Sequence, residues 1–259
     1  MLLPVIELRM FSGRVGSTLL MQLLASTPEV ALDRVYPYEN RYLTYAVHLQ
    51  QVYPLPFEPA AAEAPLLRRE ALRGIWEGMS AALVANEPAA RFYAEKQHPG
   101  VDLTPAREAG ISWRVLELVR DPRDVLVSIR EFNRKRGYPA FGRELVATEG
   151  EFLEAFIART RVRMHQFECA PDATESRAFV RYEDLVADLP ATSARLGAWL
   201  GIDLDADAVL RQRGAHAGHM TSAGDTTSAG RWRTELSPLD QRLLTEGLAK
   251  ELARMGYEA

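Results

Sequence analysis

A short apolar run near the start of the chain, Pro4–Phe11, stops abruptly at Ser12 and Gly13. Leucines then recur at helical spacing through Leu19–Leu24. This change of period predicts a strand, a tight loop and a helix. Further candidate strands alternate with candidate helices along the chain. That alternation predicts an α/β fold with a central, mainly parallel sheet and helices on both of its faces.

The other elements follow from the same patterns and from turn signals. The clearest later strands are Arg91–Lys96, Arg114–Val119 and Arg177–Tyr182. Helices are predicted at Glu63–Asn86 (with a break considered near Gly74), Asp124–Lys135, Glu149–Cys169, Pro190–Leu200 and Asp205–Arg213, and from Ser237 and Pro238 onward. We expect Glu29–Pro59 to be irregular or partly helical, and His216–Arg233, rich in Gly, Ser and Thr, to be a functional loop.

Length and charge narrow the class of protein. A chain of 259 residues suits one α/β domain spanning 1–259. Its net charge of −4 argues against a uniformly basic nucleic-acid binder. The one cysteine, Cys169, cannot form an internal disulfide, and no stretch approaches the length of a membrane span. We therefore expect a cytoplasmic protein without a membrane span.

The loop after the first strand has the composition of a phosphate cradle. Two glycines let backbone N–H groups face an anion, the following helix contributes a partial positive charge, and Arg14 adds a full one. The segment runs Ser12, Gly13, Arg14, Val15, Gly16, Ser17, Thr18. It is not a Walker A loop, because two residues rather than four separate its glycines and no lysine follows. The alternative is a tight strand–helix turn with an ordinary Ser N-cap.

A second candidate anion site follows the strand Arg114–Val119. Arg120 falls at the carboxyl end of that strand, where open α/β sheets bind ligands, and Ser128 lies eight residues further along. An arginine fork and a serine hydroxyl both suit phosphate oxygens. From Arg107 to Arg136 there are eight basic and five acidic residues. The alternative is a solvated basic helix face with Asp121 as N-cap.

Taken together, these motifs resemble those of sulfotransferases that use PAPS (3′-phosphoadenosine 5′-phosphosulfate). Arg14–Thr18 resembles their 5′-phosphosulfate loop, with Val15 where serine is usual, and Arg120–Ser128 resembles their 3′-phosphate motif. Tyr182–Leu185 and Gly230–Arg233 are similar to two later nucleotide elements, in the expected order. The resemblance implies a nucleotide site made by the loop residues Ser12, Gly13, Arg14, Val15, Gly16, Ser17 and Thr18, by Arg120, Ser128 and Tyr182, and by Ser228, Gly230, Arg231 and Trp232.

The same resemblance implies a P-loop-like fold and an activity. PAPS would donate a sulfuryl group to a hydroxyl or amine of a small-molecule acceptor, and PAP would be the product. The sequence leaves the acceptor and the oligomeric state open. Six aromatic residues could wall an acceptor pocket or could equally form core or interface. They are Tyr36, Tyr38, Tyr42, Tyr45, Tyr53 and Phe57.

Transfer to a hydroxyl needs a general base, and two residues compete for that role. Glu39 lies in a Glu-x-Arg segment similar to that of protein-tyrosine and several bacterial sulfotransferases, where a glutamate is the base. His98 lies in a segment that resembles the Lys-x-His-x-Pro of cytosolic sulfotransferases, but proline follows it directly. Glu39 is the preferred candidate. Arg14 would stabilise the leaving phosphate and the transferring sulfuryl oxygens, and Lys96 would assist.

Two rival functions share this architecture. An ATP-dependent small-molecule kinase also uses a phosphate loop, but the Walker lysine is missing here and a 3′-phosphate pair is present. A non-catalytic nucleotide-binding protein would keep the fold without transfer. His216 and His219 form an HxxH pair, yet no further ligands stand at suitable positions, so no metal site is predicted.

Overall fold

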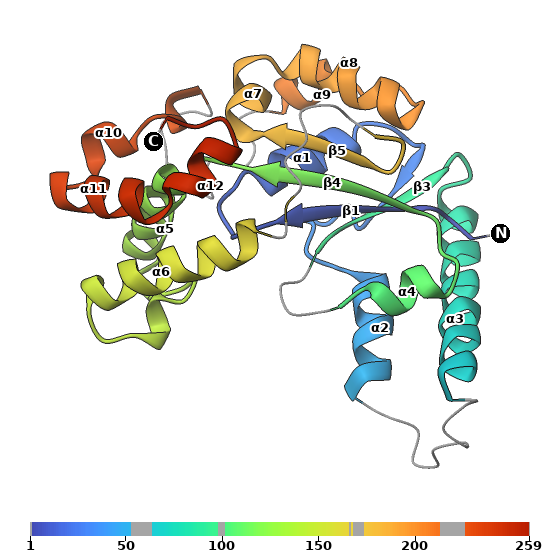
Figure 1. Cartoon of the computed structure of the whole chain (residues 1–259). Coiled ribbons are helices and arrows are strands. Elements are labelled where there is room, and N and C mark those ends of the chain that lie inside the picture. The colour runs from blue at the N-terminus through green and yellow to red at the C-terminus, as the bar shows by residue number, and fades with distance from the viewer. Residues whose placement is uncertain are drawn as a thin grey trace.

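A computed structural model describes residues 2–52, 64–97, 102–165, 167, 174–212 and 226–258. At its centre lies a five-stranded sheet in the order β2-β3-β1-β4-β5 (Figure 1). The strands are β1 (Val5–Met10), β2 (Val30–Ala31), β3 (Phe92–Lys96), β4 (Trp113–Val119) and β5 (Arg177–Arg181). All of their pairings are parallel. The predicted parallel sheet is therefore confirmed, and the carboxyl ends of its strands meet at one edge.

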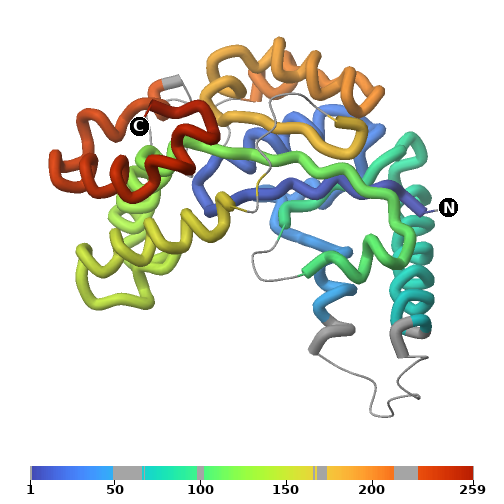
Figure 2. The backbone as a smooth tube through the Cα atoms, in the orientation of Figure 1, coloured from blue at the N-terminus to red at the C-terminus, as the bar shows by residue number. Residues whose placement is uncertain are grey.

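Helices cover both faces of this sheet, as predicted. α1 and α7 to α9 lie on one side, and α2 to α4 lie on the other (Figures 1 and 2). The helices are α1 (Ser17–Leu24), α2 (Tyr42–Val52), α3 (Ala64–Asn86), α4 (Thr104–Glu108), α5 (Pro122–Arg136), α6 (Glu149–Met164), α7 (Tyr182–Ala187), α8 (Leu189–Leu200), α9 (Ala206–Arg211), α10 (Trp232–Glu235), α11 (Pro238–Gly247) and α12 (Ala249–Arg254). Short 3-10 turns lie at Arg143–Leu145 and Thr226–Ser228.

Alternation along β1 builds a separate core on each face of the sheet. Ile6 and Leu8 are buried in one apolar cluster, which includes Leu20 of α1. Val5 is buried in another cluster, which includes Trp76 of α3. Successive strand residues point to opposite faces, so one short strand anchors both layers. This buried strand gives the loop that follows it a fixed starting point.

Capping fixes where α5 begins. The Asp121 side chain accepts a hydrogen bond from the backbone N–H of Arg123, and Pro122 occupies the first turn. Ser237 and Pro238 start α11 in the same way. Both starts agree with the sequence prediction. Because the N-cap of α5 comes two residues after the end of β4, the Arg120 side chain is held at the sheet edge.

Several element boundaries differ from the prediction. Gly74 does not break α3, since helix packing tolerates an isolated glycine. The predicted strand to Tyr182 ends at Arg181, and Tyr182 begins α7. α6 ends at Met164, and Cys169 lies outside the described residues. The segment expected to be irregular or partly helical does contain a helix, α2, and it also contains the short strand β2, which was not predicted. No helix within the described ranges combines the length and the apolar character needed to cross a membrane.

Candidate active site

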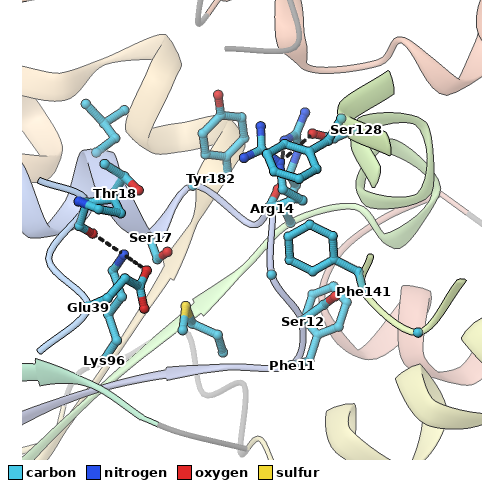
Figure 3. A pocket seen from close by; sticks show the side chains of 18 of the residues that line it. Phe11, Ser12, Arg14, Ser17, Thr18, Glu39, Lys96, Ser128, Phe141 and Tyr182 are labelled. Carbon is cyan, nitrogen blue, oxygen red and sulfur yellow. Dashed lines mark hydrogen bonds and ion pairs between the residues drawn. The ribbon is translucent and has the colours of Figure 1, made fainter. Parts of the chain in front are cut away.

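A cavity of about 850 Å³ lies at the edge where the parallel strands end. Arg14 in the loop after β1, Lys96 at the end of β3, Arg120 after β4 and Tyr182 after β5 all line it. Figure 3 shows the labelled side chains turned toward this space from separate elements. The sheet therefore brings together residues that are far apart in the sequence, at the position where open α/β sheets bind ligands.

The loop after β1 ends in a helix start that has no side-chain cap. The N-cap of α1 is Gly16, with a left-handed φ of 95°, and the first turn holds no acidic residue. A Cβ atom on Gly16 would collide with the ring of Tyr182, so only glycine fits there. The Ser N-cap of the alternative interpretation is absent, because Ser17 is already the first helical residue. The helix N-terminus thus offers its partial positive charge to the cavity, which Ser17 and Thr18 line.

Arg120 is a buried guanidinium that is held by carbonyls and an aromatic ring. It is 4 % exposed and donates to the backbone oxygens of Arg14 at 3.0 Å and Ser228 at 2.6 Å. Its Cζ atom lies 4.4 Å from the centroid of the Tyr182 ring. Among the described residues no carboxylate forms an ion pair with it, and its Nε has no hydrogen-bond partner. The Arg120 charge acts on the Asp124 and Glu183 carboxylates without pairing with either directly. An anion bound at Arg120 would give this buried charge a direct partner, so the site suits an anion.

Arg14 turns toward the same side of the cavity. Its Nε donates to the Ser128 hydroxyl at 3.3 Å, and its Cζ lies 4.9 Å from the Phe132 ring centroid. Burial, helped by the charge of Arg120, lowers the pKa of Arg14 to about 10. Arg14 and Arg120 therefore repel each other in a partly dry site. An anion bound between them would relieve that repulsion.

A second charged group lies across the cavity, around Glu39. The Lys96 ammonium donates to Glu39 Oε1 at 2.7 Å and to the carbonyl of Pro37 at 2.6 Å, and Arg41 also pairs with Glu39. The Lys96 side chain is 2 % exposed, whereas that of Glu39 is 48 % exposed. Figure 3 places this pair on the opposite side from Arg14 and Ser128, with Ser17 between. A reachable carboxylate thus lies beside a buried cation.

Glu95, next to Lys96, serves the fold rather than the cavity. Its buried carboxylate accepts hydrogen bonds from the backbone N–H groups of Leu43 at 3.0 Å and Thr44 at 3.1 Å, in the first turn of α2. The Thr44 and Tyr93 hydroxyls also donate to it. Burial raises the pKa of Glu95, against these hydrogen bonds. Glu95 therefore caps α2 from another element and fixes the segment that carries Glu39.

The predicted nucleotide residues of 228–232 divide into two groups. Ser228 lines the cavity, and its hydroxyl lies 2.6 Å from the Tyr182 hydroxyl. Gly230, Arg231 and Trp232 do not line it in the described structure. Asp124 accepts from the backbone N–H groups of Gly230 and Trp232, Arg231 pairs with Glu235, and the Trp232 ring packs on Arg123.

Two other predicted residues also differ in placement. Val15 is fully buried in the apolar core, so any contact it makes with a ligand is through its backbone. His98 lies outside the described residues. His216 and His219 also lie outside them, and no group of three metal-ligating side chains is found in the part of the chain that the structure describes.

The comparison with protein families decides the identity. The family model described as the sulfotransferase domain matches residues 16–235. The chain belongs to the sulfotransferase family. No curated protein matches the sequence of this sulfotransferase.

Solved sulfotransferases share the fold of this chain. The sulfotransferase domain from the curacin biosynthetic pathway has a TM-score of 0.57 at 17% identity, and covers 100% of this chain and 99% of its own. That of the Synechococcus PCC 7002 olefin synthase has a TM-score of 0.54 at 21% identity, covering 96% of each chain. Mouse sulfotransferase SULT7A1, solved with PAP, has a TM-score of 0.54 at 13% identity, covering 96% of this chain and 84% of its own.

The six aromatic residues of 36–57 mostly lie away from the cavity of this sulfotransferase. Only Tyr36 lines the cavity among those described. Tyr38 is buried, Tyr42 stacks on Tyr93 beside the second core cluster, Tyr45 is exposed, and Tyr53 and Phe57 lie outside the described residues. Besides Tyr36 and Tyr182, the aromatic lining consists of Phe11, Phe132, Tyr138, Phe141 and Phe156. Phe132 follows Ser128 by one helical turn, a spacing that would have revealed it.

Proposed function

We propose that this sulfotransferase moves a sulfuryl group from PAPS to a hydroxyl or amine of a small-molecule acceptor, leaving PAP. The observation that carries the proposal is the presence of two separate cationic groups in one cavity. The loop Ser12–Thr18 and Lys96 would hold the 5′-phosphosulfate. Arg120 and Ser128, with Arg14 beside them, would hold the 3′-phosphate. A ligand with an anion at each end matches this layout.

The reaction then needs one proton acceptor and one stabilised leaving group. The acceptor oxygen or nitrogen attacks sulfur, the bond between sulfur and the bridging phosphate oxygen breaks, and the electron pair leaves with PAP. Glu39 takes the proton of the acceptor, because its carboxylate is 48 % exposed and lines the cavity. Lys96 and the N-terminus of α1 stabilise the negative charge that develops on the leaving phosphate.

A comparison of PAP with ATP in thermal unfolding tests this proposal. PAP at about 100 times its dissociation constant is expected to stabilise the protein by about 2.7 kcal/mol, and ATP to stabilise it much less. Stabilisation by ATP without stabilisation by PAP would establish the rival kinase instead. A screen for transfer of radiolabelled sulfate from PAPS to hydroxyl and amine acceptors separates an enzyme from a non-catalytic PAP-binding protein.

A pH profile tests the role of Lys96. Burial lowers the pKa of Lys96 from its ordinary 10.5, and the Glu39 carboxylate only partly offsets this. The ammonium is charged below its pKa, so kcat/KM for PAPS should fall with rising pH before pH 10.5 is reached. In Lys96→Arg the alkaline fall should move to higher pH, because a guanidinium keeps its charge at higher pH than an ammonium does. Identical alkaline falls in both proteins would remove Lys96 from the PAPS site.

We also propose a cytoplasmic location. One cysteine in 259 residues supports it, because the chain has no internal disulfide that would need an oxidising compartment.

A further inference from the structure

The cavity has an aromatic lobe, defined by Phe11, Phe132, Tyr138, Phe141 and Phe156. The Phe132 and Phe141 rings meet edge to face with centroids 5.4 Å apart. The Asn133 side chain holds the loop that carries Phe141, exchanging two hydrogen bonds with the backbone of Ala140. The aromatic lobe is thus a fixed apolar wall. Resting on the proposed function, it is where the body of the acceptor would lie.

Two arginines of α6 border this lobe. Arg159 and Arg163 are one turn apart on the same face and both line the cavity. Arg159 donates to the carbonyl of Phe141 at 3.1 Å, and Arg163 donates to the carbonyl of Phe11, also at 3.1 Å. Neither forms an ion pair with a carboxylate of the described ranges. Burial lowers the pKa of Arg163, and the charge of Arg159 adds to the effect.

The remaining charges around the lobe do not neutralise this pair. Glu144 also lines the cavity, but its carboxylate accepts from the backbone N–H of Gly142 at 2.8 Å. Arg136 is a further cation, with its Cζ 5.3 Å from the Phe132 ring centroid. Together with Arg14, which also lies against the Phe132 ring, four arginines therefore border the lobe against one glutamate among the described residues. Two like charges held on a partly buried wall are unfavourable unless a bound anion compensates them.

We infer that the acceptor carries an oxyanion, a carboxylate in the simplest case, on an apolar body. The apolar body would lie in the aromatic lobe, and the guanidinium groups of Arg159 and Arg163 would bind the oxyanion. Arginine forks suit carboxylates because two parallel N–H donors match two oxygens. The reacting hydroxyl or amine would then be held at a distance from the oxyanion, toward Glu39. The arginine pair would act as a specificity device, because it favours acidic acceptors over neutral ones of the same shape.

The test compares two probes that differ by one carboxylate group, 6-hydroxy-2-naphthoate and 2-naphthol, by calorimetric titration into the PAP-saturated protein. The wild type is expected to bind the carboxylate about 10-fold or more tightly than the neutral probe, given the strength of charge-assisted hydrogen bonds. Arg159→Gln/Arg163→Gln should abolish this preference and leave 2-naphthol affinity within about twofold. The control is Arg161→Gln on the same helix, since Arg161 is exposed, binds the carbonyl of Gly247 and does not line the cavity.

Each contrary result has a distinct meaning. A wild type that binds both probes equally, or neither, overturns the inference, and so does a preference that survives in the double variant. If the double variant loses PAP affinity, the arginines serve the nucleotide and the inference fails. PAP binding to the wild type is measured separately, so its absence would count against the proposed function rather than against the acceptor. If the double variant does not fold, the salt dependence of the wild type gives an independent measurement. The preference for the carboxylate probe should fall as NaCl is raised, and a preference that does not change with salt contradicts the inference.

Discussion

Replacement of Glu39 by glutamine is expected to lower the rate of sulfuryl transfer by about 10²- to 10⁴-fold, the range of a lost general base. The amide keeps the size of the side chain but cannot take the acceptor's proton. PAP affinity should stay the same or rise, because Glu39 at present occupies the Lys96 ammonium at 2.7 Å and also pairs with Arg41. Removing that carboxylate frees both cations for the phosphosulfate. The measurement is kcat with radiolabelled PAPS, together with the dissociation constant of PAP.

A matched variant and a competing residue make this test specific. Glu87→Gln removes a surface carboxylate that pairs with Arg34, and it should leave transfer unchanged. His98→Ala addresses the other candidate base. If His98→Ala abolishes transfer while Glu39→Gln stays active, the base is His98. The ion pair between Glu39 and Lys96 would then only position Lys96. Loss of PAP affinity in Glu39→Gln would mean that the site had been disturbed rather than that a base had been removed.

Most of the fold can be predicted from the sequence because the signals for its elements are local. β1 and β4 are short, mainly apolar segments, the N-caps Asp121 and Ser237 precede prolines, and Gly16 ends a loop of recognisable composition. Each signal involves only a few neighbouring residues, so it can be recognised without knowing which element packs against it. The convergence of Lys96, Arg120 and Tyr182 also follows once the strands are taken as parallel, because parallel strands end at one edge.

Other parts of the site depend on contacts that no local pattern encodes. The sequence predicts that Arg14 acts on the transferring group. In the structure its guanidinium lies toward Ser128, where it donates a hydrogen bond to the Ser128 hydroxyl and packs on the Phe132 ring. The aromatic lobe combines residues from the loop after β1, from α5 and α6, and from the loop between those two helices, so its members are scattered over the sequence. No local pattern marks Glu95 as a helix cap, because its capping of α2 spans 51 residues of chain. Long-range packing decides all three.

Replacement of Arg120 by alanine is expected to remove most of the preference for PAP over AMP, two ligands that differ only in the 3′-phosphate. Arg120 is a buried guanidinium with an unpartnered Nε and no carboxylate partner in the described residues. Hydrogen bonds to a charged group contribute about 1.5–3 kcal/mol, so the preference should fall by about 10- to 100-fold. Affinity for AMP should change much less. The measurement is a pair of titrations on each protein, which form a double-mutant cycle between one side chain and one phosphate.

The double-mutant cycle is needed because Arg120 also stabilises the local structure. It donates to the carbonyls of Arg14 and Ser228, so its loss disturbs the loop as well as the charge, and both ligands would then weaken. Only the difference between the binding free energies of PAP and AMP reports the contact with the 3′-phosphate. Arg120→Lys, which keeps the charge without the fork, should recover part of the preference. Arg130→Ala removes an arginine of α5 that pairs with Asp240, and it should leave the preference intact. An unchanged preference in Arg120→Ala would place the 3′-phosphate elsewhere and leave the buried guanidinium with a purely structural role.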